Sequence, residues 1–152
     1  MMDIDVVVAV FCDRPERPGR IFGTEKGYGP YKGYWEFPGG KVKSGESPEE
    51  ALRREIREEL EVDMEILGLY RRAVHDYPEY RVRLSLYWAR PLGEMTLVEA
   101  SQGRWLTGEE LDPSAWLEGT RPIIEELKEV MGEDSTSPDS SLEENADPLQ
   151  KH

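Results

Sequence analysis

Three glutamates stand close together in one short segment of this sequence, at Glu55, Glu58 and Glu59. Glu46 and the turn Gly39–Lys41 precede them at short distances along the chain. Clustered carboxylates repel one another, and a hard divalent cation with oxygen ligands, such as Mg²⁺, offsets that repulsion. Glutamates on a helix also form solvated acidic faces, supported by Glu–Arg pairs. The turn and Glu46 favour the metal site over the solvated face.

The segment that carries these glutamates has the signals of an α-helix that begins after Ser47 and runs to about Leu60. Ser47 can cap the helix, Pro48 occupies a position that needs no N–H, and Glu50 completes a capping box. With about 100° between successive residues, the three glutamates fall within an arc of roughly 100°. The neighbouring apolar stripe, which would dock the helix on a core, comprises Leu52, Ile56 and Leu60.

The spacing resembles the signature box of the Nudix hydrolase family, whose pattern is G-x5-E-x7-R-E-U-x-E-E-x-G-U, with U an aliphatic residue. One position departs from the pattern, because Glu61 stands where the family has glycine. That glycine closes the helix with a positive φ, and another residue there costs about 1 kcal/mol. The departure therefore concerns the local turn and not the chemistry. The positions that match are Gly40, Glu46, Arg54, Glu55, Ile56, Glu58, Glu59 and Val62.

The resemblance extends beyond the box to short segments at residues 20–22, 27–29, 35–40, 76–78, 81–90 and 104–107. These segments look like the MutT-like nucleoside triphosphate pyrophosphohydrolases, of the 8-oxo-dGTP diphosphatase or CTP pyrophosphohydrolase type. The likeness covers roughly residues 4–130. It implies the Nudix fold, an α/β (α+β) structure in which an α/β/α sandwich surrounds a mixed β-sheet.

The resemblance implies that the glutamates of the helix bind Mg²⁺ or Mn²⁺. In the family, residues at the positions of Glu55, Glu58 and Glu59 hold the ion or ions. The backbone carbonyl of the residue at Gly39 joins them. The number of ions and the preference between the two metals stay open.

Two basic residues, Arg54 and Lys41, accompany the acidic residues. The family role of Arg54 is to hold the carboxylates in place, here together with Glu46. A surface ion pair is the alternative for Arg54. Lys41 is adjacent to the site, where it could reach a phosphate, although on composition alone it would be a solvated lysine.

A further acid, Glu99, precedes Trp105 by six residues, which is the spacing in the MutT-like relatives. The landmark at Trp105 favours a role for Glu99 as metal ligand or general base. Many nucleotide-hydrolysing relatives have Glu-His-Glu here, whereas this chain has Glu99 followed by Ala100 and Ser101. The general base therefore stays open between Glu99 and a glutamate of the box, among which Glu55 is favoured. The predicted catalytic residues are Lys41, Arg54, Glu55, Glu58 and Glu99.

Recognition of the base is the part on which the sequence says least. Tyr77 and Tyr80 flank a proline turn, and aromatic rings stack on nucleobases with little discrimination, each contributing about 1–3 kcal/mol. Relatives carry Asn or Asp just before the last helix, where this chain has Thr120, whose hydroxyl cannot pair bidentately. We therefore expect Lys41, Tyr77, Tyr80 and Thr120 to contact substrate, with ordinary packing as an equal alternative for Tyr77 and Tyr80. For the loop tyrosines Tyr28, Tyr31 and Tyr34, ordinary packing is the favoured interpretation.

The resemblance implies metal-dependent hydrolysis of a (deoxy)nucleoside triphosphate to the monophosphate and pyrophosphate, which would cleanse the nucleotide pool. One alternative is hydrolysis of another nucleoside diphosphate derivative, such as ADP-ribose, a dinucleotide or an RNA 5′ end. Another is a non-catalytic nucleotide-binding module. The intact set of box glutamates disfavours that module.

Length and charge agree with one α/β domain of residues 1–131 followed by an acidic tail of residues 132–152. The net charge is −13, and six acids against one lysine in the tail leave −8 for the domain. An acidic body disfavours stable nucleic-acid binding, and the polar tail should be disordered. The apolar run 6–11 is too short to span a bilayer. We expect a cytoplasmic protein, either monomer or homodimer, that binds a small nucleotide.

The single cysteine, Cys12, excludes an intrachain disulfide and a cysteine-based zinc site. It ends an apolar run, so we expect buried packing and not a nucleophile. Alternation predicts that residues 80–90 form a half-buried antiparallel strand with Val82, Leu84, Leu86 and Trp88 on one face. The last predicted helix covers residues 120–131, with Thr120 as its cap. Other predicted strands cover residues 4–12, 20–25, 64–75 and 104–106, with a helical turn at 108–111.

Overall fold

A computed structural model describes residues 2–135 of the chain, with side chains as far as Met131. The strands are β1 (Met2–Phe11), β2 (Arg20–Glu25), β3 (Trp35–Glu36), β4 (Gly39–Lys41), β5 (Met64–Asp76), β6 (Tyr80–Pro91) and β7 (Gln102–Thr107). The α-helices are α1 (Pro48–Leu60) and α2 (Arg121–Ser135), and three 3₁₀ turns are η1 (Gly108–Glu110), η2 (Pro113–Ala115) and η3 (Glu118–Thr120).

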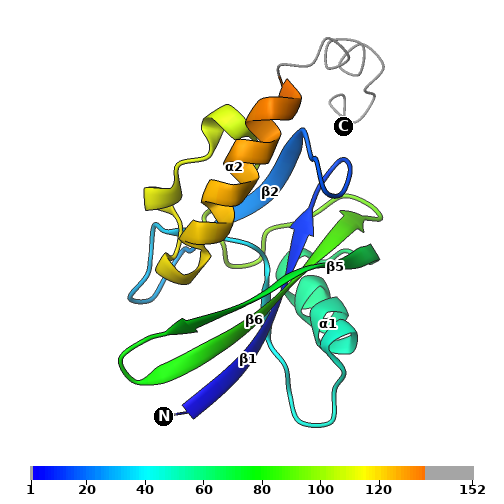
Figure 1. The fold of residues 1–152 in the computed structure, drawn as a ribbon. Coiled ribbons are helices and arrows are strands. Elements are labelled where there is room, and N and C mark those ends of the chain that lie inside the picture. Colours follow the sequence, from blue (N-terminus) through cyan, green and yellow to red (C-terminus); the bar gives the residue numbers. More distant parts are fainter. Residues whose placement is uncertain (1, 136–152) are drawn as a thin grey trace.

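The strands form two sheets between the two helices. Four strands pair in the order β4-β1-β6-β5, with β1 and β6 parallel and the other pairs antiparallel, so this sheet is mixed. The other sheet has the order β3-β2-β7 and is antiparallel. Figure 1 shows α1 and α2 on opposite sides of β1 and β6. The predicted α/β/α sandwich around a mixed sheet is confirmed.

Alternating side chains of the central strand β1 serve two separate cores. Val8 and Val10 pack in the core that contains the apolar face of α2. Val7, Ala9 and Phe11 point the other way, into the core that contains the apolar face of α1. Successive side chains of a strand point to opposite faces, so a strand covered on both sides reads as a continuous apolar run. Cys12 is buried at the end of this run, as expected.

The prediction of a half-buried antiparallel strand at residues 80–90 was only partly right. β6 is antiparallel to β5, but it is parallel to β1. Its first half alternates in exposure, whereas all four residues from Leu86 to Ala89 are buried. Leu86 and Trp88 face the α2 core, and Tyr87 and Ala89 face the α1 core. The strand is covered on both faces because it lies inside the sheet between the two helix layers.

Helix α1 begins and ends as its sequence indicates. The Ser47 side chain accepts a hydrogen bond from the Glu50 N–H, and the Glu50 side chain accepts one from the Ser47 N–H. Glu61 closes the helix at φ 53° and ψ 43°, and its N–H donates to the carbonyl of Arg57. The positive φ expected at Glu61 is therefore confirmed.

Helix α2 runs from Arg121 to Ser135, which is four residues beyond the predicted end at Met131. Thr120 directly precedes it as the last residue of η3. The buried residues of its inner face are Ile123, Ile124, Leu127 and Met131, whereas Val130 is half-buried. Most of the predicted acidic tail, residues 136–152, lies outside the described residues.

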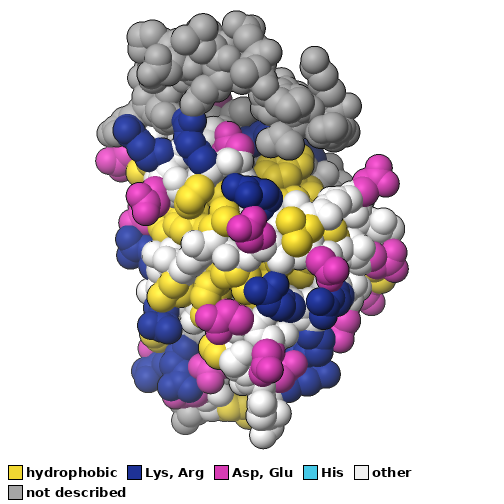
Figure 2. Space-filling view, turned by 90° about the vertical axis from the view of Figure 1, so that its right-hand side faces the viewer, with side chains coloured by type: hydrophobic (Ala, Val, Ile, Leu, Met, Phe, Trp, Pro, Cys, Tyr) yellow, Lys and Arg dark blue, Asp and Glu magenta, His cyan; other side chains and the backbone are white. Residues whose placement is uncertain are grey.

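Neither described helix combines the length and the apolarity that crossing a bilayer requires. On the face shown in Figure 2, basic and acidic side chains are interspersed around apolar ones.

Candidate active site

The turn before α1 requires two glycines, for different reasons. Gly39 has φ 155°, and a Cβ there would lie 2.0 Å from the carbonyl oxygen of Val7 on the paired strand β1. A Cβ on Gly40 would lie 2.3 Å from the carboxyl carbon of Glu55. Glycine at both positions therefore lets the turn pair with β1 and lets the Glu55 carboxylate lie against the backbone.

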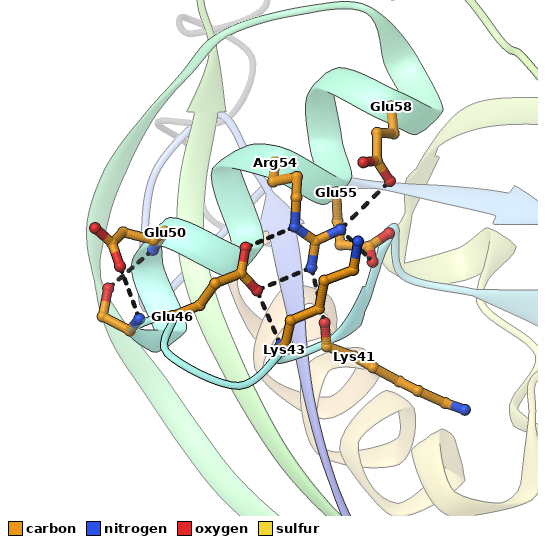
Figure 3. A network of polar contacts seen from close by, with 8 residues as sticks. Lys41, Lys43, Glu46, Glu50, Arg54, Glu55 and Glu58 are labelled. Carbon is orange, nitrogen blue, oxygen red and sulfur yellow. Dashed lines mark hydrogen bonds and ion pairs between the residues drawn. The ribbon is translucent and has the colours of Figure 1, made fainter.

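Arg54 is the centre of a network of ion pairs on the exposed side of α1 (Figure 3). Its guanidinium donates two hydrogen bonds to Glu46, at 2.6 Å and 3.0 Å, and one to the Lys41 carbonyl at 3.0 Å. The same group donates to Glu55 at 3.1 Å and to Glu58 at 3.4 Å. The hydrogen bonds from Arg54 hold the pKa of Glu46 at about 2. The expected contact between Arg54 and Glu46 is present, and it orients the glutamates.

Glu59 is partly buried and bonds to the glycine turn. Its carboxylate accepts a hydrogen bond from the Gly39 N–H at 3.2 Å. Burial raises the pKa of Glu59 to about 8, and the negative charges of Glu36 and Glu55 raise it further, against the Gly39 N–H and Lys26.

These side chains are an all-oxygen donor set, which suits a hard divalent cation. Among the described residues, no three His, Cys, Asp or Glu side chains converge as a ready-made metal cluster. Arg54 holds Glu55 and Glu58, while Glu59 is turned toward Gly39. The residues nevertheless fit a cation, because the carboxylates of Glu36 and Glu55 act on Glu59 strongly enough to raise its pKa, and a divalent cation would offset that repulsion.

Glu99 lies at a small cavity of about 80 Å³ beside Glu59. The backbone explains this position, since the N–H of Val98 donates to the carbonyl of Glu59 at 3.2 Å. The structure therefore brings the predicted distal acid to one of the box glutamates. We call this space the acidic cavity, and its other lining residues include Lys26, Tyr28 and Glu36.

Three of the four predicted substrate contacts line one larger cavity, of about 210 Å³, which we call the aromatic cavity. They are Tyr77, Tyr80 and Thr120. The Tyr77 and Tyr80 rings are stacked, with centroids 5.2 Å apart. Lys41, the fourth, is exposed and lines neither cavity, and its side chain extends away from Arg54 (Figure 3).

Lys26 and Glu36 line both cavities, and sequence reasoning missed them. The Lys26 ammonium lies 3.5 Å from the Glu36 carboxylate. Burial raises the pKa of Glu36, which the charge of Lys26 opposes. The available signal was a base at the start of the glycine- and tyrosine-rich loop 26–34 and an acid shortly after its end. The loop tyrosines Tyr28, Tyr31 and Tyr34, for which packing was expected, are 58%, 40% and 38% exposed. The Tyr31 and Tyr34 rings pack edge to face against each other.

Comparison with known proteins finds hydrolases that are similar to this chain. The 8-oxo-dGTP diphosphatase of Proteus vulgaris is 34% identical over 105 residues, which are 62% of this chain and 88% of that protein. The CTP pyrophosphohydrolase of Escherichia coli K12 is 42% identical over 64 residues, which are 41% of this chain and 44% of that protein. A MutT NUDIX hydrolase from Burkholderia pseudomallei, solved by crystallography, is similar with a TM-score of 0.71 at 27% identity. That match covers 82% of this chain and 98% of the other.

The family match is broader than any of these pairwise similarities. Residues 3–127 match the family described as NUDIX domain. This range spans well over half of the chain and includes the glycine turn, α1, Glu99 and both cavities. Hydrolases of this family typically need divalent metal ions. The chain therefore belongs to the NUDIX domain family and is a Nudix pyrophosphohydrolase.

Proposed function

We propose that the protein hydrolyses (deoxy)nucleoside triphosphates to the monophosphate and pyrophosphate, and so removes unwanted nucleotides from the cellular pool. The observation that carries this proposal is the junction of the two cavities. The aromatic cavity and the acidic cavity share Lys26 and Glu36. A nucleotide whose base lies in the first places its phosphates toward the second. The names of the relatives, which include an 8-oxo-dGTP diphosphatase and a CTP pyrophosphohydrolase, support a nucleotide of this class.

The aromatic cavity supplies the base site in this proposal. Tyr77 and Tyr80 offer ring faces for stacking, which contributes about 1–3 kcal/mol per base. Thr120, buried directly before α2, offers one hydroxyl. A single hydroxyl discriminates between base edges less sharply than a bidentate amide, so substrate preference depends on stacking as well.

The acidic cavity and the exposed face of α1 supply the phosphate site. Glu55, Glu58, Glu59 and Glu99, with the Gly39 carbonyl, would hold Mg²⁺ or Mn²⁺, which neutralises phosphate charge when bound. The Lys26 ammonium at the junction attracts a phosphate without metal. Lys41 could reach a phosphate only by turning from its exposed position.

Hydrolysis also needs a base that accepts a proton from the attacking water. Glu55 and Glu99 are the two candidates. Arg54 donates to Glu55 at 3.1 Å and thereby fixes its orientation, with Glu46 holding Arg54 from the other side. Glu99 lies on the loop at the acidic cavity, where a water can reach it.

The experiment is incubation of the purified protein and Mg²⁺ with a nucleotide panel, followed by ion-exchange separation of the products. The panel contains the ordinary triphosphates, 8-oxo-dGTP, 5-methyl-dCTP, ADP-ribose and diadenosine polyphosphates. We expect monophosphate and pyrophosphate from at least one triphosphate. Glu55→Gln should abolish this turnover without unfolding the protein, whereas Glu65→Gln, in an exposed pair with Arg90, should not change it.

Two other outcomes would contradict the proposal in different ways. Cleavage of ADP-ribose or dinucleotides alone would support the assigned catalytic site but would show that the substrate is another nucleoside diphosphate derivative. Absence of cleavage with both Mg²⁺ and Mn²⁺ would favour a nucleotide-binding module.

A further inference from the structure

The Glu99 carboxylate lies on a loop whose backbone is firmly held. The N–H of Thr96 donates to the Leu60 carbonyl at 2.8 Å, and the N–H of Ser101 donates to the Glu25 carbonyl at 3.0 Å. These bonds tie the loop to the end of α1 and to β2. They place the Cα of Glu99 near the acidic cavity, but they do not determine where its flexible side chain points.

Among the described residues, Tyr28 donates the hydrogen bond that the Glu99 side chain accepts. The Tyr28 hydroxyl donates to Glu99 Oε1 at 3.3 Å, across 71 positions of sequence. Both residues line the acidic cavity together with Glu59. The direction in which the Glu99 carboxylate points therefore depends on a residue from another loop.

Local features bring Tyr28 to this place. A Cβ on Gly27 would lie 2.5 Å from the Glu99 carbonyl oxygen, so glycine permits the two loops to touch. The Lys26 ammonium lies 5.8 Å from the centre of the Tyr28 ring, a cation–π contact. The ring is 58% exposed, so these contacts at the cavity, and not burial in a core, define its position.

We propose that Tyr28 is a positioning residue, which holds the Glu99 carboxylate toward Glu59 so that Glu99 can act on the phosphates or on the attacking water. This inference rests on the proposed function, because it assigns Glu99 a part in the reaction. Removing the Tyr28 hydroxyl leaves the Glu99 side chain free to turn into solvent. The lost hydrogen bond to an exposed carboxylate corresponds to a fall in kcat of about 3- to 10-fold.

The test is a double-mutant cycle of the full chain, made of wild type, Tyr28→Phe, Glu99→Gln and the double variant. We measure kcat and KM for the best triphosphate at saturating Mg²⁺. Tyr28→Phe should lower kcat by about 3- to 10-fold with little change in KM. In the Glu99→Gln background the same substitution should have no further effect, because the residue through which it acts is gone.

Tyr34→Phe is the matched control. Tyr34 belongs to the same loop and is likewise partly exposed, but it lines neither cavity, and its variant should keep the wild-type kcat. An equal loss from Tyr28→Phe in both backgrounds would mean that Tyr28 only stabilises its loop, and would overturn the proposal. Full kcat in Glu99→Gln would overturn it as well.

The failure of the proposed function can be distinguished from the failure of this inference. If wild type cleaves no nucleotide, the proposed function fails. The Mn²⁺ affinity of the same four proteins is then measured by electron paramagnetic resonance. Weaker Mn²⁺ binding in Tyr28→Phe, absent from the Glu99→Gln background, would support the positioning role. Unchanged affinity in Tyr28→Phe would overturn it.

Discussion

Arg54 is the residue on which the orientation of the acidic side chains most depends. Its planar guanidinium reaches Glu46, Glu55 and Glu58 at the same time, as well as the carbonyl of Lys41. A lysine ammonium is a compact charge without this fork geometry, so it cannot replace all of these bonds. The acidic network therefore needs arginine, and not merely a positive charge, at this position.

Arg54→Lys should raise the Mg²⁺ concentration required for half-maximal turnover by about 10- to 100-fold. A loss of metal affinity of this size is typical when a residue that orients metal ligands is replaced. The measurement is initial rate against Mg²⁺ concentration. Arg57→Lys is the control, because Arg57 lies one turn further along α1 and pairs only with the exposed Asp63 among the described residues. If both variants lose activity equally, the loss comes from the charge of the helix and not from Arg54.

Cys12 should be inert in the native protein. It is 2% exposed, and burial raises the pKa of its thiol to about 12, so almost no thiolate forms near neutral pH. We expect reaction with a disulfide reagent at pH 8 only under denaturing conditions, followed by absorbance. Rapid labelling of the native protein would show that the chain opens locally at Cys12, directly after β1. The folded state retains this proton more tightly than the unfolded chain, so the associated stability is present below about pH 9 and is lost as the pH rises through about 12.

At the scale of single residues, the sequence allowed us to predict contacts between residues that are close along the chain. Arg54 and Glu46 are linked by one loop and one helix, and their contact follows from local spacing. Lys26 and Glu36 were missed because their position depends on the pairing of β3 with β2, in which Thr24 faces Glu36. A strand of two residues has no alternation from which this pairing could be predicted.

Among helices and strands, too, features set by the local sequence were predictable, and features set by tertiary packing were not. The start of α1 was predictable because its capping box is complete within four residues. The burial of both faces of β6 was not, because the alternation of one strand does not indicate which layers will cover it. The longer α2 reflects continued helical structure where polar composition had predicted a tail.

The end of α1 offers a way to stabilise the protein. Glu61 adopts φ 53°, a conformation that its Cβ disfavours and that glycine adopts freely. Glu61→Gly should therefore raise the free energy of unfolding by about 1 kcal/mol, measured by denaturant titration. Glu61→Ala is the control, since it removes the carboxylate but keeps the Cβ, and it should not stabilise. Equal gains in both variants would show that charge, and not backbone strain, is relieved.

At the scale of the whole molecule, negative charge and metal binding act on the same folding equilibrium. The chain carries a net charge of −13, and its site holds the partly buried Glu59 near Glu36 and Glu55. Without metal, the folded protein keeps the Glu59 proton up to about pH 8, whereas an unfolded glutamate loses it near pH 4.5. The stability associated with this proton is therefore present below about pH 4.5 and is lost as the pH rises through about 8.

Mg²⁺ should reverse this loss, because a cation binds the ionised site and competes with the proton. We expect the rise in Tm on adding saturating Mg²⁺ to be larger at pH 8.5 than at pH 6, measured by differential scanning calorimetry. In Glu59→Gln the titrating group is absent, so both the Mg²⁺ effect and its dependence on pH should shrink. Glu65→Gln, with its exposed carboxylate, should behave as wild type. A Mg²⁺ effect that is equal at the two pH values in wild type would mean that Glu59 is not among the groups that the cation neutralises.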